Sequence, residues 1–162
     1  MKFSHFDEEG RAKMADVTGK AVTEREAIAR GSVLMKPETI SLIKDKAIQK
    51  GDVITVAKTA AIMGAKKTWE LVPMCHPLGI TSVSVDIAVD AENSRVNINA
   101  EVKTIGQTGV EMEALTAVSV AALTVYDMCK SADKEMVISD IVLVEKRGGK
   151  SGEYRRNKTH CS

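Results

Sequence analysis

The rest of this chain is expected to pack around the stretch TGVEMEALTAVSVAALTVYDMCK, residues 108–130. Thr108 followed three residues later by Glu111 has the spacing of a capping box, which predicts that a helix begins here. No charged residue stands between Glu113 and Asp127, and apolar or small residues occupy every face of the helix. A helix that is apolar all round is buried all round. We therefore expect this helix to pack on a sheet or in a subunit interface.

The alternative for this stretch is a membrane-spanning helix. About 18 residues of this kind could nearly cross a bilayer. However, Glu113, Ser119 and the repeated threonines do not suit a hydrocarbon environment. The pattern therefore favours a buried helix in a protein core over a transmembrane span.

The charges of this stretch stand at its two ends, with Glu111 and Glu113 at the start and Asp127 and Lys130 at the finish. At 1.5 Å per residue, Glu113 and Asp127 lie about 21 Å apart along the helix, so one copy cannot bring both to one small substrate. If both act in a single site, a second subunit supplies one of them, which predicts a homo-oligomer with sites between subunits. The alternative is that both are ordinary solvated helix ends.

Length and composition limit the class of protein. The chain has 162 residues, which suits one domain with a sizeable core. Its 23 Lys and Arg residues nearly balance 22 Asp and Glu residues, so the total charge indicates neither a nucleic-acid nor a membrane-surface protein. Cys75, Cys129 and Cys161 have no metal-ligand spacing, which disfavours a zinc site or a disulfide framework and suits a reducing cytoplasm. The opening MKFSHFDEEGR has no apolar segment and does not resemble a signal peptide.

The first part of the chain predicts a polar arm, a strand and two helices. Residues 1–28 lack periodicity, which indicates a mobile N-terminal arm. An apolar segment at 30–36 predicts a strand, and Pro37 suits the first turn of the helix that follows. Helical spacing continues up to Gly51, which ends this helix, and Asp52 caps a second one.

The remaining elements are predicted by prolines and by a period of two. One further helical turn is expected at 68–72, and the two prolines of PMCHP, residues 73–77, make the next loop stiff. Apolar and polar residues alternate at 81–89 and again at 96–102, which predicts an antiparallel hairpin with one buried face. A final strand is expected at 136–145, before a glycine-rich basic segment.

In order, these elements are strand, helix pair, strand, strand, helix and strand. This order predicts an α+β fold, the ferredoxin-like βαββαβ sandwich, in which helices cover one face of an antiparallel sheet. We expect a single domain at 29–154, preceded by the arm at 1–28 and followed by a C-terminal tail at 155–162.

Basic residues stand at the ends of several predicted elements, namely Lys50, Lys66, Lys130 and Lys146. Glycines beside some of these cations allow close approach of phosphate groups, which favours a polyanion pocket. The alternative for each lysine alone is a solvated surface position, which is where most lysines lie. The segment GGKS at 148–151 lacks the earlier glycine and the following helix of a P-loop.

His76 and Asp127 are the candidates for proton transfer. A histidine in a stiff loop can transfer protons near neutral pH or bind a phosphate, although it can equally serve only as a hydrogen-bond partner of the backbone. Asp127 stands three residues before Lys130, and partial burial would make the two an acid/base pair. The alternative is an ordinary i,i+3 surface ion pair.

Five strings carry a resemblance to a known family: MADVTGK (14–20), KGDV (50–53), AKKTWELVPMCHPL (65–78), TGVEMEALTAVSVAALTVYDMCK (108–130) and GGKSG (148–152). They cover nearly the whole chain and closely resemble the molybdenum cofactor biosynthesis protein C family, whose members are cyclic pyranopterin monophosphate synthases. The resemblance implies a cytoplasmic lyase that converts (8S)-3′,8-cyclo-7,8-dihydroguanosine 5′-triphosphate to cyclic pyranopterin monophosphate and releases diphosphate. It also implies a ferredoxin-like catalytic domain.

The resemblance further implies a homohexamer, a trimer of dimers with active sites between subunits. It implies no resident cofactor and no protein-bound metal, while Mg²⁺ accompanying the triphosphate is left open. By motif match, the catalytic residues are Asp127, Lys130 and Lys50. The implied substrate-binding residues are Met74, Cys75, His76, Met112, Glu113, Lys66, Lys146 and Arg25. Lys67 and Arg147 depart from the family pattern, and the tail after Tyr154 matches nothing in it.

Two other classes of protein share this order of elements. An RNA-recognition domain needs aromatic side chains on its sheet, and the segments 81–89 and 95–103 contain none. A regulatory domain that senses a small molecule would bind a ligand without turnover. Release of diphosphate from the cyclised nucleotide separates an enzyme from such a domain.

Overall fold

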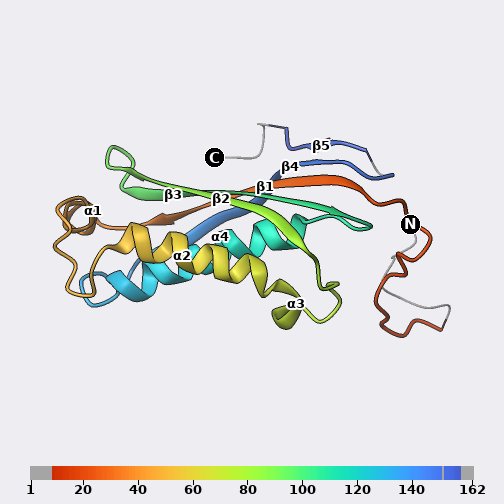
Figure 1. The fold of residues 1–162 in the computed structure, drawn as a ribbon. Coiled ribbons are helices and arrows are strands. Elements are labelled where there is room, and N and C mark those ends of the chain that lie inside the picture. Colours follow the sequence, from red (N-terminus) through yellow and green to blue (C-terminus); the bar gives the residue numbers. More distant parts are fainter. Residues whose placement is uncertain (1–8, 151, 158–162) are drawn as a thin grey trace.

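The computed structural model describes residues 9–150 and 152–157, and its elements follow the predicted order (Figure 1). The helical turn expected at 68–72 is present as the short helix α3, and the short strand β5 is the one addition among the described residues. The elements are β1 (Thr23–Leu34), α1 (Pro37–Lys44), α2 (Val53–Lys66), α3 (Thr68–Leu71), β2 (Ile80–Asp90), β3 (Arg95–Gly106), α4 (Glu111–Cys129), β4 (Val137–Arg147) and β5 (Tyr154–Arg155).

The strands form one sheet in the order β2-β3-β1-β4-β5, and all neighbours are antiparallel. Since β3 lies between β1 and β2, and β1 lies between β3 and β4, the chain makes two split βαβ units. This arrangement confirms the predicted ferredoxin-like α+β fold. The predicted hairpin is also confirmed, with Ile87 opposite Ile98 and Val85 opposite Ala100.

Helices α2 and α4 lie side by side under one face of the sheet (Figure 1). Two glycines allow this close packing. A Cβ on Gly31 of β1 would lie 2.7 Å from Val118 Cγ1 of α4, and a Cβ on Gly64 of α2 would lie 2.8 Å from Val120 Cγ2 of α4. Larger residues at either glycine would push α4 away from its neighbours, because no real Cβ contact is this short.

Helix α4 is the central core element. By length and composition alone it could cross a membrane, but half of its apolar window is buried inside the fold. Ala117, Ala121 and Ala122 are fully buried, whereas Leu123 is 59% exposed. Within a single chain, therefore, α4 is buried on one side only, and the expectation of burial on every face is not met.

The domain boundaries expected from the sequence need two corrections. Strand β1 begins at Thr23, so residues 23–28 belong to the sheet and not to an arm. The polar sequence of this segment hid the strand, since only Ala27 there is fully buried. At the other end, Tyr154–Arg155 pairs with β4 as β5, so a boundary after residue 154 divides a strand. Residues 1–8 of the expected arm and 158–162 of the expected tail lie outside the described residues.

The prediction for the first helix is correct at its start, but the predicted helix is too long at its end. Pro37 occupies its first turn as predicted, but the helix ends at Lys44 and not next to Gly51. Ile48, which suggested a longer helix, is buried in the connection that follows. The N-cap of α2 is confirmed, since Asp52 Oδ1 accepts a hydrogen bond from the Thr55 N–H at 3.0 Å.

Candidate functional site

The structure divides the predicted site residues into two groups at opposite ends of α4. The first, which we call the Asp127 group, consists of Lys50, Asp127 and Lys130. Lys50 Nζ donates to Asp127 Oδ2 at 2.9 Å and to the Asp127 carbonyl oxygen at 2.8 Å. Lys130 Nζ lies 2.6 Å from Asp127 Oδ1. Each carboxylate oxygen therefore has its own ammonium partner.

Local structure explains how Lys50 reaches Asp127. Gly51 takes a positive φ of 106°, a conformation that other residues rarely adopt, and turns the chain into α2. Lys50 contacts a carbonyl at the C-terminal end of α4, where the helix dipole favours a cation.

The electrostatics of the Asp127 group keep its carboxylate ionised. Hydrogen bonds from Lys130 first, and from Lys50 next, lower the pKa of Asp127 to about 2. The same contact raises the pKa of Lys130. All three side chains are about half exposed, so an incoming ligand can reach them.

The second group, which we call the Glu113 group, lies at the N-terminal end of α4. Glu113 is only 4% exposed, and burial raises the pKa of its carboxyl to about 7. The pKa of the Cys75 thiol is also raised, first by burial and then by the charge of Glu113. Both side chains are therefore removed from solvent, and the thiol lies near enough to feel the charge of the carboxyl.

The loop between α3 and β2 carries Met74, Cys75 and His76, which are all partly buried. A hydrogen bond from Cys75 N–H to the Val72 carbonyl closes its first turn at 3.0 Å. His76 lines a cavity of about 320 Å³ together with the connection from β3 to α4. The stiff loop predicted at 73–77 thus delivers a histidine and a thiol to one end of α4.

Cations approach the same end of α4 from β1 and β4. Arg25 Nε donates to the Gly106 carbonyl at 3.0 Å, and Arg25 Nη2 donates to the Gln107 carbonyl at 3.2 Å. Lys146 Nζ lies 3.0 Å from Glu111 Oε1. Arg25, Glu111 and Lys146 line a second cavity of about 310 Å³.

The predicted capping box is wrong. The N-cap of α4 is Val110, and no side chain caps the helix within the described residues. The helix begins two residues later than the box requires, so Thr108 lies outside the N-cap position and Glu111 is the first helical residue. The Glu111 carboxylate instead accepts a hydrogen bond from Lys146 Nζ of β4.

Two further predicted site residues, Lys66 and Met112, have weaker links to the Asp127 group and the Glu113 group. Lys66 is the last residue of α2 with an exposed side chain, and within the described residues it makes no ion pair with either group. Met112 is 39% exposed at the start of α4. Lys20 also lines the cavity of Arg25 and Lys146 but was not predicted as a site residue. The MADVTGK string, which ends with Lys20 and carries part of the family resemblance, could have indicated it.

Within residues 9–150 and 152–157, no group of three or more His, Cys, Asp and Glu side chains could hold a metal ion. The absence of a resident metal or cofactor, and the participation of Mg²⁺ with a triphosphate, stay predictions.

The fold and these two groups define a class: a ferredoxin-like α+β protein with ionisable residues gathered at both ends of one core helix. A model of the MoaC family matches residues 14–149, and the chain belongs to this family. It is 59% identical over 156 residues to the cyclic pyranopterin monophosphate synthase of Thermoanaerobacter pseudethanolicus, covering 96% of this chain and 99% of the relative. It is also 59% identical over 152 residues to the synthase of that name from Desulfatibacillum aliphaticivorans, covering 94% and 96%.

Proposed function

We propose that this chain is a cyclic pyranopterin monophosphate synthase, a lyase of molybdenum cofactor biosynthesis. The reaction converts (8S)-3′,8-cyclo-7,8-dihydroguanosine 5′-triphosphate to cyclic pyranopterin monophosphate and releases diphosphate. Membership of the MoaC family and the names of the relatives support this function. The observation that carries it is the Asp127 carboxylate held between two lysines at one end of α4.

In the proposed mechanism, the Asp127 group transfers protons during rearrangement of the purine. With a pKa of about 2, the carboxylate is a weak base while both lysines neutralise it. A bound triphosphate competes for the ammonium groups of Lys50 and Lys130. Their movement toward phosphate raises the pKa of Asp127 and makes it a better base, while each lysine can act as the acid.

The Glu113 group is proposed to bind the substrate and to take part in the same proton transfers. Because the pKa of Glu113 is about 7, this carboxyl can accept or donate a proton at neutral pH. Arg25 and Lys146 are suited to bind phosphate oxygens and to stabilise the leaving diphosphate. Met74, Cys75, His76, Met112 and Lys66 are proposed to contact the substrate around them.

We further propose a cytoplasmic homohexamer, a trimer of dimers, in which each active site joins the Asp127 group of one subunit to the Glu113 group of another. These groups lie about 21 Å apart along α4, so one chain cannot bring both to one small substrate, which supports shared sites. A two-fold axis near the middle of α4 would bring the end of one helix to the start of its partner.

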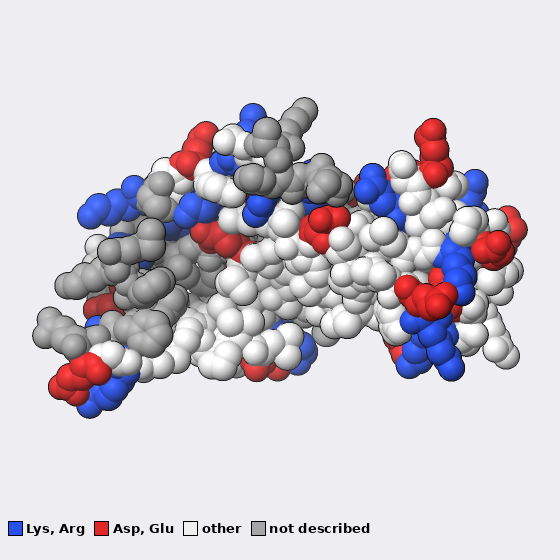
Figure 2. Space-filling view, turned by 180° about the vertical axis from the view of Figure 1, so that it is seen from behind, with Lys and Arg blue, Asp and Glu red and all other residues white. Residues whose placement is uncertain are grey.

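The surface of the helices supports the same assembly. Apolar side chains stand exposed on both helices, including Val56 and Met63 of α2 and Leu123 of α4. On the face drawn in Figure 2, charged side chains gather mainly toward the two ends of the molecule, with a largely uncharged surface between them. Such a surface between charged ends suits burial in an oligomer.

Subunit mixing tests both proposals. Asp127→Asn disables one group and Lys146→Ala the other, so neither variant alone should turn over substrate well. After denaturation and refolding of an equal mixture, half of the dimers are mixed and each has one intact site. About a quarter of wild-type diphosphate release should return. Recovery of no activity in assembled hybrids would contradict shared sites.

The matched control mixes Lys50→Ala with Asp127→Asn. Both changes lie in the same group, so every mixed dimer places one lesion in each of its sites. This mixture should stay inactive. Recovery of activity in both mixtures would contradict the proposal that each site combines one group from each end of α4.

A further inference from the structure

The face of the sheet opposite α2 and α4 carries a polar cavity that the proposed reaction does not use. Its volume is about 410 Å³, which is within the range of small-molecule sites. The polar side chains that line it are Arg30, Ser32, Arg95, Asn97, Asn99 and Asp140. They belong to three neighbouring strands, β1, β3 and β4.

Strand register brings these residues together. Ser32 of β1 lies opposite Asn97 of β3 and opposite Ser139 of β4. Gly31 faces α4, so its neighbour Ser32 faces the other side of the sheet. The pairing of β1 with β4 is interrupted between Arg30 and Ser32, where Asp140 takes a positive φ of 55°. This bulge places Asp140 at the rim of the cavity.

Ser32 gives the first sign of a ligand. Its side chain is only 4% exposed, and its hydroxyl has no hydrogen-bond partner in the part of the chain that the structure describes. A buried hydroxyl without a partner is unfavourable, so this residue is expected where a ligand completes its hydrogen bonding.

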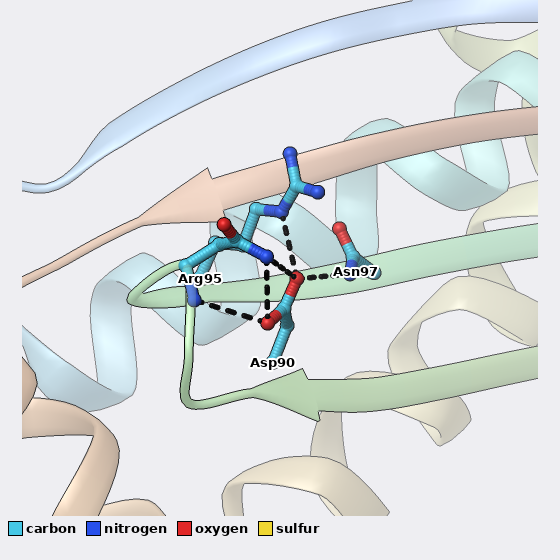
Figure 3. Close-up of polar contacts among 4 residues, drawn as sticks. Asp90, Arg95 and Asn97 are labelled. Atoms are coloured by element: carbon cyan, nitrogen blue, oxygen red, sulfur yellow. Dashed lines mark hydrogen bonds and ion pairs between the residues drawn. The ribbon is translucent and has the colours of Figure 1, made fainter.

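Arg95 gives the second sign (Figure 3). Its Nε donates to Asp90 Oδ2 at 3.1 Å, and Asp90 is itself held by the Asn93 N–H at 3.1 Å and by Asn97 Nδ2 at 3.5 Å. Figure 3 shows the two terminal guanidinium nitrogens directed away from Asp90. Among the described residues, these nitrogens have no hydrogen-bond partner. Asp90 therefore fixes the guanidinium and leaves its bidentate edge available.

We propose that this cavity binds a phosphate group, either inorganic phosphate or the phosphoryl end of a small phosphate ester. The terminal nitrogens of Arg95 donate two parallel hydrogen bonds to phosphate oxygens, the geometry that guanidinium groups favour. The Ser32 hydroxyl donates a third, and Asn97 supports the site from the adjacent strand. Asp140 at the rim accepts a hydrogen bond from a hydroxyl of an ester, which favours a hydroxylated ester over phosphate itself.

Equilibrium dialysis of the full chain tests this proposal, with radiolabelled inorganic phosphate and glycerol 3-phosphate as separate probes. A Lys146→Ala background weakens phosphate binding at the end of α4. In that background, Arg95→Gln should raise Kd at least about tenfold and Ser32→Ala about threefold. Lys103→Gln is the matched control: it lies on the same strand and the same face as Arg95, outside the cavity, and should leave Kd unchanged.

Ser32→Ala keeps the proposal testable even if Arg95→Gln disturbs the hairpin, because it removes only a hydroxyl that has no hydrogen-bond partner among the described residues. In the wild-type background it should leave diphosphate release unchanged, so failure of this proposal and failure of the proposed reaction are distinguishable. The proposal would be overturned if the Lys146→Ala chain bound neither probe, or if Arg95→Gln and Ser32→Ala both left Kd unchanged in that background. A changed assembly mass in Ser32→Ala would also overturn it, since this face would then be a contact between subunits.

Discussion

The two ends of α4 hold carboxyl groups in opposite environments. Asp127 is exposed and shared between two lysines, which lower its pKa to about 2. Glu113 is only 4% exposed, and burial raises its pKa to about 7. One helix thus presents a permanently ionised carboxylate at one end and a carboxyl that titrates near neutral pH at the other.

The two ends of α4 have complementary properties for the proposed shared active site. A cation-rich, exposed cluster attracts a triphosphate, while a buried carboxyl can exchange a proton without water nearby. Neither environment provides both properties. In the proposed dimer, the antiparallel arrangement of two α4 helices brings the two environments together twice.

Asp127→Asn should have the largest effect. The change removes the carboxylate that accepts protons in the proposed mechanism but keeps the size and shape of the side chain, so the oligomer and substrate affinity should persist. Turnover, measured as diphosphate release, should fall by about 10³-fold or more. Asp86→Asn is the control, since Asp86 is an exposed acid near a lysine elsewhere on the surface. Near-normal turnover of Asp127→Asn would refute the acid/base role.

One of the two lysine contacts in the Asp127 group could be predicted from spacing alone. Lys130 lies one helical turn from Asp127, so the i,i+3 ion pair follows from the helix. Lys50 lies 77 residues earlier in the chain, and only the resemblance to a family indicated that it belongs here. Spacing cannot show such a contact, because it depends on how α2 packs against α4.

The same distinction holds for the fold. A period of two predicted the hairpin, and Pro37 and Asp52 predicted two helix starts, because these signals act within a few residues. The start of β1, the Lys146 contact that replaces the capping box, and the cavity around Ser32 depend on pairing between distant strands. No local pattern encodes them.

Glu113→Gln should have the next largest effect, on stability and on its pH dependence. As pH rises from 4.5 to 7, the carboxyl ionises in the unfolded chain while the folded chain keeps its proton. Stability should therefore fall across this window, by up to about 3 kcal/mol, and stay level above it. In Glu113→Gln this fall should disappear, as measured by urea unfolding at pH 5 and pH 8.

Asp127→Asn sharpens the same measurement, because the pKa of Asp127 is shifted in the opposite direction. Its contribution to stability is present above pH 3.8 and is lost only as pH falls toward 2. This variant should therefore keep the wild-type difference between pH 5 and pH 8. If Glu113→Gln also keeps that difference, the buried carboxyl is not the group that titrates.

The smallest expected effect concerns the reactivity of Cys75. The thiolate is the reactive form, and burial together with the charge of Glu113 raises the pKa of this thiol. Glu113→Gln removes the charge but leaves the burial, so alkylation of Cys75 by iodoacetamide at pH 8 should become about threefold faster. The assay uses a Cys161→Ser background. Cys129 should react slowly in every variant, since burial raises its pKa to about 11.

In dissociated chains, Asp127→Asn is the matched control, because within one chain its charge lies at the far end of α4. If the proposed dimer forms, however, the Asp127 of a partner approaches Cys75, and the variant should change the rate slightly in the assembled protein but not in dissociated chains. Alkylation rates measured across a dilution series therefore test two proximities. One is that of Glu113 to Cys75 within a subunit, and the other is that of Asp127 to Cys75 between subunits. A rate in Glu113→Gln equal to that of the wild type would place the thiol too far from the carboxyl for its charge to raise the pKa of Cys75.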